Sequence, residues 1–207
     1  MKKSTKNIGI IVLAAGASKR LGKPKQLLYF RGETLLKRAA KIAAASGCQP
    51  VIVVLGANTE NLAREIEEFD VEIVENLDWE NGMGTSIQSG LKRLLEICPD
   101  ISGVIITVGD QPLVSVELIR KLTASFRLSD VPIVACSYGD AIGVPALFSR
   151  RILPELSALE ADTGARKIIY RYRESVFKIP FEAGAVDVDT ERDYLNLIES
   201  SEKNFEK

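Results

Sequence analysis

Short apolar runs rich in Val and Ile recur along the chain, and longer segments with apolar positions at helical spacing lie between them. Continuous apolar runs of this length are typical of strands that are covered on both faces of a sheet. We therefore predict strands over residues 8–14, 51–55, 71–74, 103–108, 132–136 and 142–148.

Helices are predicted between these strands, over residues 34–46, 58–69, 83–97, 115–126, 163–173 and 190–199. One apolar stripe is clearest in the third of them, at Met83, Ile87, Leu91 and Leu94. Asn58 and Ser115 stand at expected N-cap positions, and Gly47 suits the position that follows a helix.

The alternation of strands and helices predicts the fold class. It is typical of an α/β protein whose mostly parallel central sheet is covered by helices on both faces, a Rossmann-like three-layer α/β/α arrangement. Neither a repeat nor a linker interrupts the pattern, so we expect a single domain over residues 1–200. Residues 201–207 form a polar C-terminal tail in this interpretation.

The composition of the 207 residues narrows the possible chemistry. A net charge of -1 gives no general attraction for nucleic acid or for an anionic membrane, so we expect neither as a partner. The chain contains 0 His, which excludes Ser-His and Cys-His nucleophiles and a His-ligated zinc site. Catalysis must then depend on carboxylates, cations, backbone amides or a bound metal.

Cysteine usage and hydropathy bear on the location of the protein. Its 3 cysteines show neither metal-ligand nor redox spacing, which favours a reducing compartment. Basic residues before the apolar run 8–15 also resemble the start of a signal peptide. Because that run also fits a buried first strand, and because membrane spans need about 20 apolar residues, we expect a cytoplasmic protein.

The segment after the first predicted strand is a candidate binding loop. Residues 13–27 read L-A-A-G-A-S-K-R-L-G-K-P-K-Q-L. In open α/β sheets, ligands bind beyond the carboxyl ends of the strands, and small residues allow backbone N–H groups to approach an anion. Four cations follow within seven residues, at Lys19, Arg20, Lys23 and Lys25. We predict a phosphate-binding loop; the alternative is a solvated basic turn, which Lys19 and Lys23 fit best.

Two common phosphate-binding motifs are absent from this loop. A Walker A loop needs four residues between its glycines, whereas five residues separate Gly16 from Gly22 and Pro24 follows Lys23. The dinucleotide motif G-x-G-x-x-G is also missing, which argues against an oxidoreductase. The loop is therefore an anion-binding loop of another kind.

The loop resembles that of the molybdenum cofactor cytidylyltransferases, which belong to the molybdopterin nucleotidyltransferases of the GT-A-like superfamily. Their pattern is roughly L-A-[AG]-G-x-S-x-R-[ML]-G-x-x-K-x-L, and residues 13–27 match it. Further segments follow in the family's order: N-L-D-W-E-N-G-M-G-T-S at 76–86, G-D-Q-P at 109–112, G-V-P at 143–145, D-T-G-A-R at 162–166 and D-V-D-T at 187–190.

This resemblance spans nearly the whole chain and implies both fold and activity. It implies a GT-A-like fold and Mg²⁺-dependent transfer of CMP from CTP to the terminal phosphate of molybdopterin cofactor, with release of pyrophosphate. Ala15 stands where guanylyl-transferring members carry a second Gly, and so favours CTP. The implied partners are CTP and the cofactor as small-molecule substrates, with a recipient molybdoenzyme as a further candidate.

The resemblance also assigns roles to individual residues. The catalytic residues would be Arg20, Lys25 and Asp110, and Mg²⁺ would be bound by Asp110 and Asp189. The nucleotide would contact Leu13, Ala14, Ala15, Gly16, Gly22, Lys25, Gly82 and Ser86. The acceptor would contact Asp162 and Arg166.

Each assignment has a purely structural alternative. Asp110 also fits an ordinary turn before Pro112, and Asp189 fits the N-cap of the last helix, in which case Asp187 is the next candidate ligand. Trp79 fits either a packing anchor or a stacking platform for the pterin.

The remaining assignments lie near predicted helix starts, which gives them the same ambiguity. Gly82, Gly84 and Ser86 fit helix entry alone. Asp162 fits a helix N-cap, and Arg166 one turn further on fits an ion-pair partner for it.

Two other functions remain open at this point. One is another nucleotidyl transfer, such as guanylyl transfer, or transfer to a sugar or polyol phosphate. The other is a carrier that delivers nucleotide or finished cofactor to an apo-molybdoenzyme.

Overall fold

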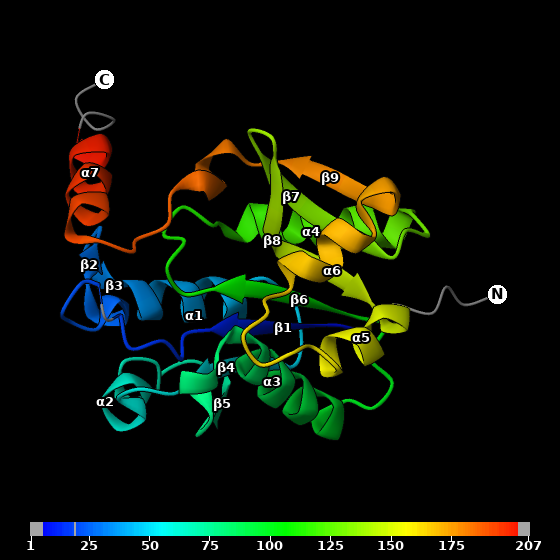
Figure 1. The fold of residues 1–207 in the computed structure, drawn as a ribbon, viewed down its shortest axis with the longest axis horizontal. Helices are drawn as coiled ribbons and strands as arrows, with labels where there is room; N and C mark the ends of the chain where they lie inside the picture. The colour runs from blue at the N-terminus through cyan, green and yellow to red at the C-terminus, as the bar shows by residue number, and fades with distance from the viewer. Residues whose placement is uncertain (1–5, 19, 203–207) are drawn as a thin grey trace.

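The computed structural model describes residues 6–18 and 20–202, so Lys19 and the basic residues at positions 2 and 3 lie outside the described residues. A seven-stranded sheet crosses the molecule in the order β5-β4-β1-β6-β8-β7-β9 (Figure 1). Its strands are β1 (Ile8–Leu13), β4 (Val51–Leu55), β5 (Glu72–Glu75), β6 (Gly103–Val108), β7 (Ile133–Tyr138), β8 (Ala141–Ser149) and β9 (Val176–Pro180). Strand β8 is antiparallel to its neighbours and the other pairs are parallel, which confirms the predicted mostly parallel sheet.

Helices cover both faces of this sheet. One face packs against α1 (Leu35–Ala45), α2 (Thr59–Arg64) and α4 (Val116–Leu128). The other packs against α3 (Met83–Ile97), α5 (Leu153–Ser157) and α6 (Arg166–Arg171). The residues of β1 alternate between these two cores, because successive side chains of a strand point to opposite faces. The predicted three-layer α/β/α arrangement is confirmed.

The stripe predicted on α3 is the clearest example of this packing. Ile87, Leu91 and Leu94 are at most 1% exposed, and burying one such side chain stabilises the fold by about 1.5–3 kcal/mol. Met83, the first residue of the stripe, instead lines the pocket described below.

A third, smaller core lies at one end of the molecule. A two-stranded hairpin, β2 (Tyr29–Phe30) and β3 (Glu33–Thr34), packs there with α7 (Glu191–Glu202) through Phe30, Val188 and Leu197 (Figure 1). Short 3-10 helices complete the chain at Lys25–Leu27, Trp79–Asn81, Arg150–Ile152, Arg173–Ser175 and Glu182–Ala185.

Several predicted boundaries differ from the observed ones. Helix α2 ends at Arg64 because the chain continues in three-residue turns, such as Ile66 N–H to the carbonyl of Ala63. Asn58 is not its side-chain N-cap, since it adopts a left-handed conformation (φ 62°) and makes no capping hydrogen bond. Ser115 and Gly47 behave as predicted: the Ser115 hydroxyl accepts from Leu118 N–H at 3.2 Å, and Gly47 has a φ of 84°.

Other differences concern elements that the patterns did not indicate. Strand β9 and α5 have five residues each, and strands β2 and β3 have two each, so all are too short for a period to appear. Helix α7 continues through residues 201 and 202, two positions into the predicted tail. Within the described ranges, no helix is both long and apolar enough to cross a membrane.

Candidate functional site

The carboxyl ends of β1 and β6 bring two predicted site segments together. Leu13 and Val108 are paired in register, and Gly109 N–H donates to the carbonyl of Leu13 at 2.9 Å. A side chain at Gly109 would meet the methyl group of Ala14 at 3.3 Å. Parallel pairing therefore places the loop that follows β1, called the first loop below (within residues 13–27), directly beside the turn that carries Asp110.

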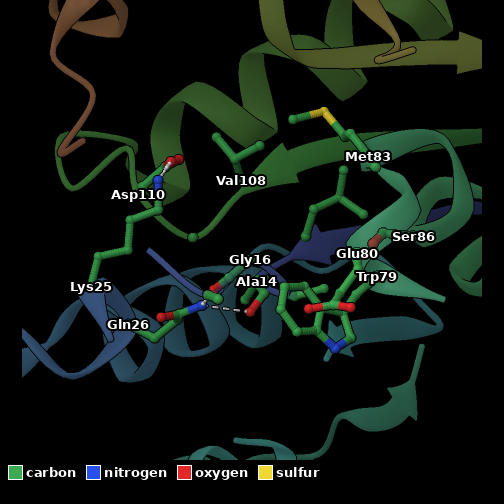
Figure 2. A pocket seen from close by; sticks show the side chains of 15 residues that line it. Ala14, Gly16, Lys25, Gln26, Trp79, Glu80, Met83, Ser86, Val108 and Asp110 are labelled. Atoms are coloured by element: carbon green, nitrogen blue, oxygen red, sulfur yellow. Dashed lines mark hydrogen bonds and ion pairs between the residues drawn. The ribbon is translucent and has the colours of Figure 1, made fainter. Parts of the chain in front are cut away.

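A pocket of about 360 Å³ opens at this edge of the sheet (Figure 2). The first loop, the β6 turn and the start of α3 all contribute to its walls. Its lining includes the predicted residues Leu13, Ala14, Ala15, Gly16, Lys25, Gly82, Ser86 and Asp110. It also includes Gln26, Glu80, Met83 and Val108, which sequence reasoning did not select, and Trp79, for which two roles had been considered.

Lys25 joins two carboxylates from distant parts of the chain. Its ammonium forms a short ion pair with Oδ2 of Asp110 and lies 3.0 Å from Oδ1 of Asp189. The guanidinium of Arg20 lies 3.6 Å from the other oxygen of Asp189. The structure thus brings together in one charged cluster all four residues to which a catalytic or metal-binding role was assigned.

This cluster shifts the pKa values of its members. Burial alone would lower the pKa of Lys25, but Asp110 and then Asp189 outweigh it, so the pKa lies above its usual value. Asp187 is close to the same group: burial and then the charge of Asp110 raise the pKa of its carboxyl. Three carboxylates therefore share the electrostatic environment of Lys25.

Asp189 does not cap the last helix, contrary to the structural alternative considered above. Thr190 does so instead: its hydroxyl accepts from Asp193 N–H at 3.2 Å, and the Asp193 carboxylate accepts from Thr190 N–H at 2.8 Å. This reciprocal pair is a capping box with Asp in place of Glu. Because Thr190 takes the capping role, the carboxylate of Asp189 is left to face Lys25 and Arg20.

The donor set of this cluster fits a divalent cation. One carboxylate oxygen each from Asp110 and Asp189 converges on the same ammonium, so both already face one cation. Hard oxygen donors of this kind suit Mg²⁺, which proteins often bind through one or two carboxylates together with substrate phosphates. Among the described residues, no set of three or more His, Cys, Asp or Glu side chains is arranged to hold a metal alone.

The start of α3 forms another wall of the pocket. Ser86 is 5% exposed, and its hydroxyl accepts from the side-chain amide of Asn76 at 3.0 Å, so it is a buried residue of the pocket wall and does not face bulk solvent. Gly82 and Gly84 lie against the backbone of residues 160–162: Gly84 N–H donates to the carbonyl of Ala161 at 2.8 Å. Their lack of side chains permits this contact, a role beyond helix entry.

The predicted acceptor residues lie at the edge of this region rather than in the pocket lining. Asp162 is not an N-cap, because α6 begins at Arg166 after a turn in which Thr163 N–H donates to the carbonyl of Glu160. Arg166 pairs with the hydroxyl and ring of Tyr170 rather than with Asp162. The hydrogen bond to Tyr170 is the main cause that raises the pKa of Arg166, and the charge of Asp187 adds a smaller contribution in the same direction.

Gly22 is the predicted nucleotide-binding residue that the structure places least well for that role. It has a φ of 71° in a turn and does not line the pocket. Its requirement for glycine is explained by the left-handed conformation alone. Lys23 pairs with Glu191 at 3.8 Å on the surface, which agrees with the alternative of a solvated cation.

These features are typical of α/β enzymes that bind a phosphorylated ligand beyond the carboxyl ends of their strands. The chain belongs to the family of MobA-like NTP transferase domains, whose model matches residues 10–176. It is accordingly a nucleotidyltransferase related to the molybdopterin cofactor enzymes, and its substrates are small molecules. Asp187 and Asp189 lie beyond the matched residues.

Individual relatives agree with this membership. Nicotine blue oxidoreductase of Paenarthrobacter nicotinovorans is 32% identical over 197 residues, which cover 91% of this chain and 95% of that protein. The crystal structure of Rv0371c from Mycobacterium tuberculosis has 32% identity and a TM-score of 0.79, covering 95% of this chain and 99% of that one. A second structure of Rv0371c, at 30% identity, a TM-score of 0.76 and coverage of 94% and 99%, is a complex with manganese.

A more distant structure shares the fold. Molybdopterin-guanine dinucleotide biosynthesis protein A from Archaeoglobus fulgidus has 18% identity and a TM-score of 0.67, covering 94% of this chain and 99% of that one. At this identity the likeness concerns the three-layer architecture.

Proposed function

We propose that this protein transfers CMP from CTP to the terminal phosphate of molybdopterin cofactor, with Mg²⁺, and releases pyrophosphate. The observation that carries the proposal is the convergence of Lys25, Asp110 and Asp189 at the mouth of a pocket formed by the first loop. A cation beside two carboxylates suits a reaction in which two polyanions must be brought together. Family membership supports the reaction class.

Asp110 and Asp189 are the proposed ligands of Mg²⁺. When bound, the metal neutralises charge on the triphosphate and on the leaving pyrophosphate. The manganese complex of Rv0371c supports a divalent metal in a related protein. Lys25 and Arg20 are proposed to neutralise the remaining phosphate charge, since both already face these carboxylates.

The proposed step is an in-line displacement at the α-phosphorus. An oxygen of the acceptor phosphate forms a bond to this phosphorus while the bond to the β-phosphate oxygen breaks, and pyrophosphate departs. The second pKa of a phosphomonoester is about 6, so the acceptor oxygen is already ionised at neutral pH. A general base is therefore unnecessary, which agrees with a chain that contains 0 His.

Two pocket residues support a preference for CTP. Ala15 occupies the position at which the resembling guanylyl transferases carry a second Gly. The carboxylate of Glu80 lies at the pocket beside the indole of Trp79 (Figure 2). A carboxylate accepts hydrogen bonds and cannot donate them, so it favours a base with an amino group, such as cytosine, over uracil.

Asp162 and Arg166 remain the proposed acceptor-binding residues. Arg166 provides a guanidinium for an anionic group and lies over the ring of Tyr170. Asp162 belongs to the segment that packs on Gly82 at the start of α3. The acceptor would then approach the nucleotide from the side of α6. Transfer of the product to a molybdoenzyme is part of the same proposal.

The test is pyrophosphate release with Mg²⁺ and purified molybdopterin cofactor, comparing CTP, GTP, ATP and UTP. We expect release with CTP that is lost in Asp110→Ala and Lys25→Ala. Equal or faster release with GTP would overturn the assignment of the base. Arg150→Ala serves as a control, because Arg150 follows Ser149, which pairs with Gly103 at the end of β6 opposite the pocket.

Other outcomes favour the alternative functions. Release with a sugar or polyol phosphate, but not with molybdopterin, would indicate another nucleotidyltransferase. Delivery of cofactor to an apo-enzyme by Asp110→Ala, without turnover, would indicate a carrier. Because one relative is named an oxidoreductase, oxidation of NADH or NADPH is measured alongside, and its presence without pyrophosphate release would contradict the proposal.

A further inference from the structure

Gln26 is a buried amide at the base of the first loop. It follows Lys25 directly in the chain, is 3% exposed and lines the pocket. Its Nε2 donates to the carbonyl of Ala14 at 2.8 Å and to that of Gly16 at 2.7 Å (Figure 2). One side chain therefore holds two carbonyl groups of the loop at once.

These contacts determine the direction of the loop's backbone N–H groups. In a trans peptide the carbonyl of one residue and the N–H of the next point in opposite directions. Because the carbonyls of Ala14 and Gly16 point at Gln26, the N–H groups of Ala15 and Ala17 point away from it. The intervening carbonyl of Ala15 is held by Ala57 N–H at 3.1 Å, so the N–H of Gly16 points away from that residue.

The orientation of the amide is itself fixed. The hydroxyl of Ser18 lies 3.5 Å from Oε1 of Gln26 as a donor, and it accepts from Lys25 N–H at 3.0 Å. The oxygen of Gln26 therefore faces Ser18, and its NH₂ group faces the carbonyls. Only an amide supplies two donors from one nitrogen at this length, since a glutamate in its place would present acceptors to two carbonyls.

We propose that Gln26 is a positioning residue for nucleotide binding. By holding the carbonyls of Ala14 and Gly16, it leaves the N–H groups of Ala15 and Ala17 to donate to acceptor atoms of the bound nucleotide. Backbone N–H groups of a loop that face a ligand form a favourable site for an anion, whereas carbonyls in their place would repel it. This inference rests on the proposed function, because it assumes that the pocket binds an NTP.

The test compares Gln26→Met and Gln26→Glu with a matched control, Gln88→Met. Gln88 also donates its Nε2 to a backbone carbonyl, that of Leu159 at 2.6 Å, but it does not line the pocket. The affinity for CTP with Mg²⁺ is measured by calorimetry. We expect a loss of about tenfold in Gln26→Met, a larger loss in Gln26→Glu, and a change of less than about twofold in the control.

The outcomes separate the inference from the proposed function. If the unaltered protein does not bind CTP, the proposed function fails and the inference with it. If the protein binds CTP and Gln26→Met binds it equally well, the inference alone is overturned. Amide hydrogen exchange gives a readout that needs no variant: CTP should protect the amides of residues 15–17, and unchanged exchange there would overturn the inference even if the variants do not fold.

Discussion

The ammonium of Lys25 lies 3.0 Å from Oδ1 of Asp189, although the two residues are 164 positions apart in the chain. The same ammonium contacts Asp110 at the end of β6. The side chains of Lys25 and Asp110 are 18% and 19% exposed, so water screens this pair only partly. Lys25 thus offsets part of the negative charge of the two carboxylates that are the proposed metal ligands.

Replacement of Lys25 by Met should have two effects of opposite sign. Without metal, Lys25→Met leaves Asp110 and Asp189 facing each other, and we expect a loss of about 1–3 kcal/mol in the free energy of unfolding. With Mg²⁺ or Mn²⁺, the variant should bind the metal more tightly than the unaltered protein, because a competing cation has been removed. Thermal unfolding with and without metal, together with metal titration calorimetry, measures both effects.

Lys23→Met provides the comparison for this experiment. Lys23 belongs to the same loop but pairs at 3.8 Å with the exposed carboxylate of Glu191, so its loss should change neither stability nor metal affinity measurably. Weaker metal binding in Lys25→Met than in the unaltered protein would contradict the competition between ammonium and metal.

The capping box before α7 predicts a dependence on pH. Hydrogen bonds from the hydroxyl and N–H of Thr190 hold the pKa of Asp193 below its usual value. A pKa lowered by folding means that this contribution to stability is complete above about pH 4 and is lost as the pH falls through the lowered value. We expect the protection of the amides at the start of α7, measured relative to the exchange rate of an unstructured chain at the same pH, to fall below about pH 4, and to be low already at neutral pH in Asp193→Ala.

Glu199 is an exposed residue of the same helix, and Glu199→Ala should leave the pH dependence of amide protection unchanged. The expected loss of amide protection concerns the segment next to Asp189. It can therefore be compared with the affinity for metal measured at each pH. An exchange rate at residues 190–194 that does not respond to Asp193→Ala would contradict the role of the capping box.

The cysteines should differ in their reactivity. Burial raises the pKa of Cys136 to about 12 and also raises that of Cys48, whereas Cys98 is only partly buried. A thiol with a pKa near 12 is ionised in only about one molecule in ten thousand at pH 8, and the thiolate is the reactive form. We expect iodoacetamide to modify Cys98 first in the folded protein and all three only after denaturation, as counted by mass spectrometry. Modification of Cys136 as fast as that of Cys98 would contradict this expectation and would show that the core around Cys136 opens in the folded protein.

Much of the fold could be predicted because its long elements carry their own periodicity. The buried strands β1 and β4 are apolar throughout, β6 is apolar except for Thr107, and α3 shows an apolar stripe at helical spacing. Strand β9 was not predicted, because it is a short edge strand whose residues include the exposed Phe177. Its position depends on parallel pairing with β7, a contact between distant segments that local patterns do not contain.

The candidate site was predictable where local sequence and strand topology coincide. Lys25 and Asp110 follow adjacent parallel strands, so their proximity could be expected before any coordinates. Asp189 remained ambiguous, because only the structure gives the capping role to Thr190. Sequence patterns did not indicate a role for Gln26, because that role depends on hydrogen bonds to the carbonyls of Ala14 and Gly16, which only the folded loop brings to it.

The contact between α3 and the proposed acceptor segment leads to a final prediction. An added Cβ at Gly84 would lie 2.1 Å from the carbonyl oxygen of Glu160 and 2.9 Å from that of Ala161. Both neighbours are backbone atoms, so Gly84→Ala must displace the segment that carries Asp162, at a cost of about 1–3 kcal/mol in stability.

Because the displaced segment belongs to the proposed acceptor side, the KM for the acceptor should rise more than the KM for CTP. The comparison is Lys92→Ala, an exposed substitution on the same helix, which should change neither constant. Steady-state kinetics with each substrate varied in turn measures the two effects separately. A rise confined to the KM for CTP would mean that residues 160–162 belong to the nucleotide side of the site, and Asp162 would then lose its proposed role in acceptor binding.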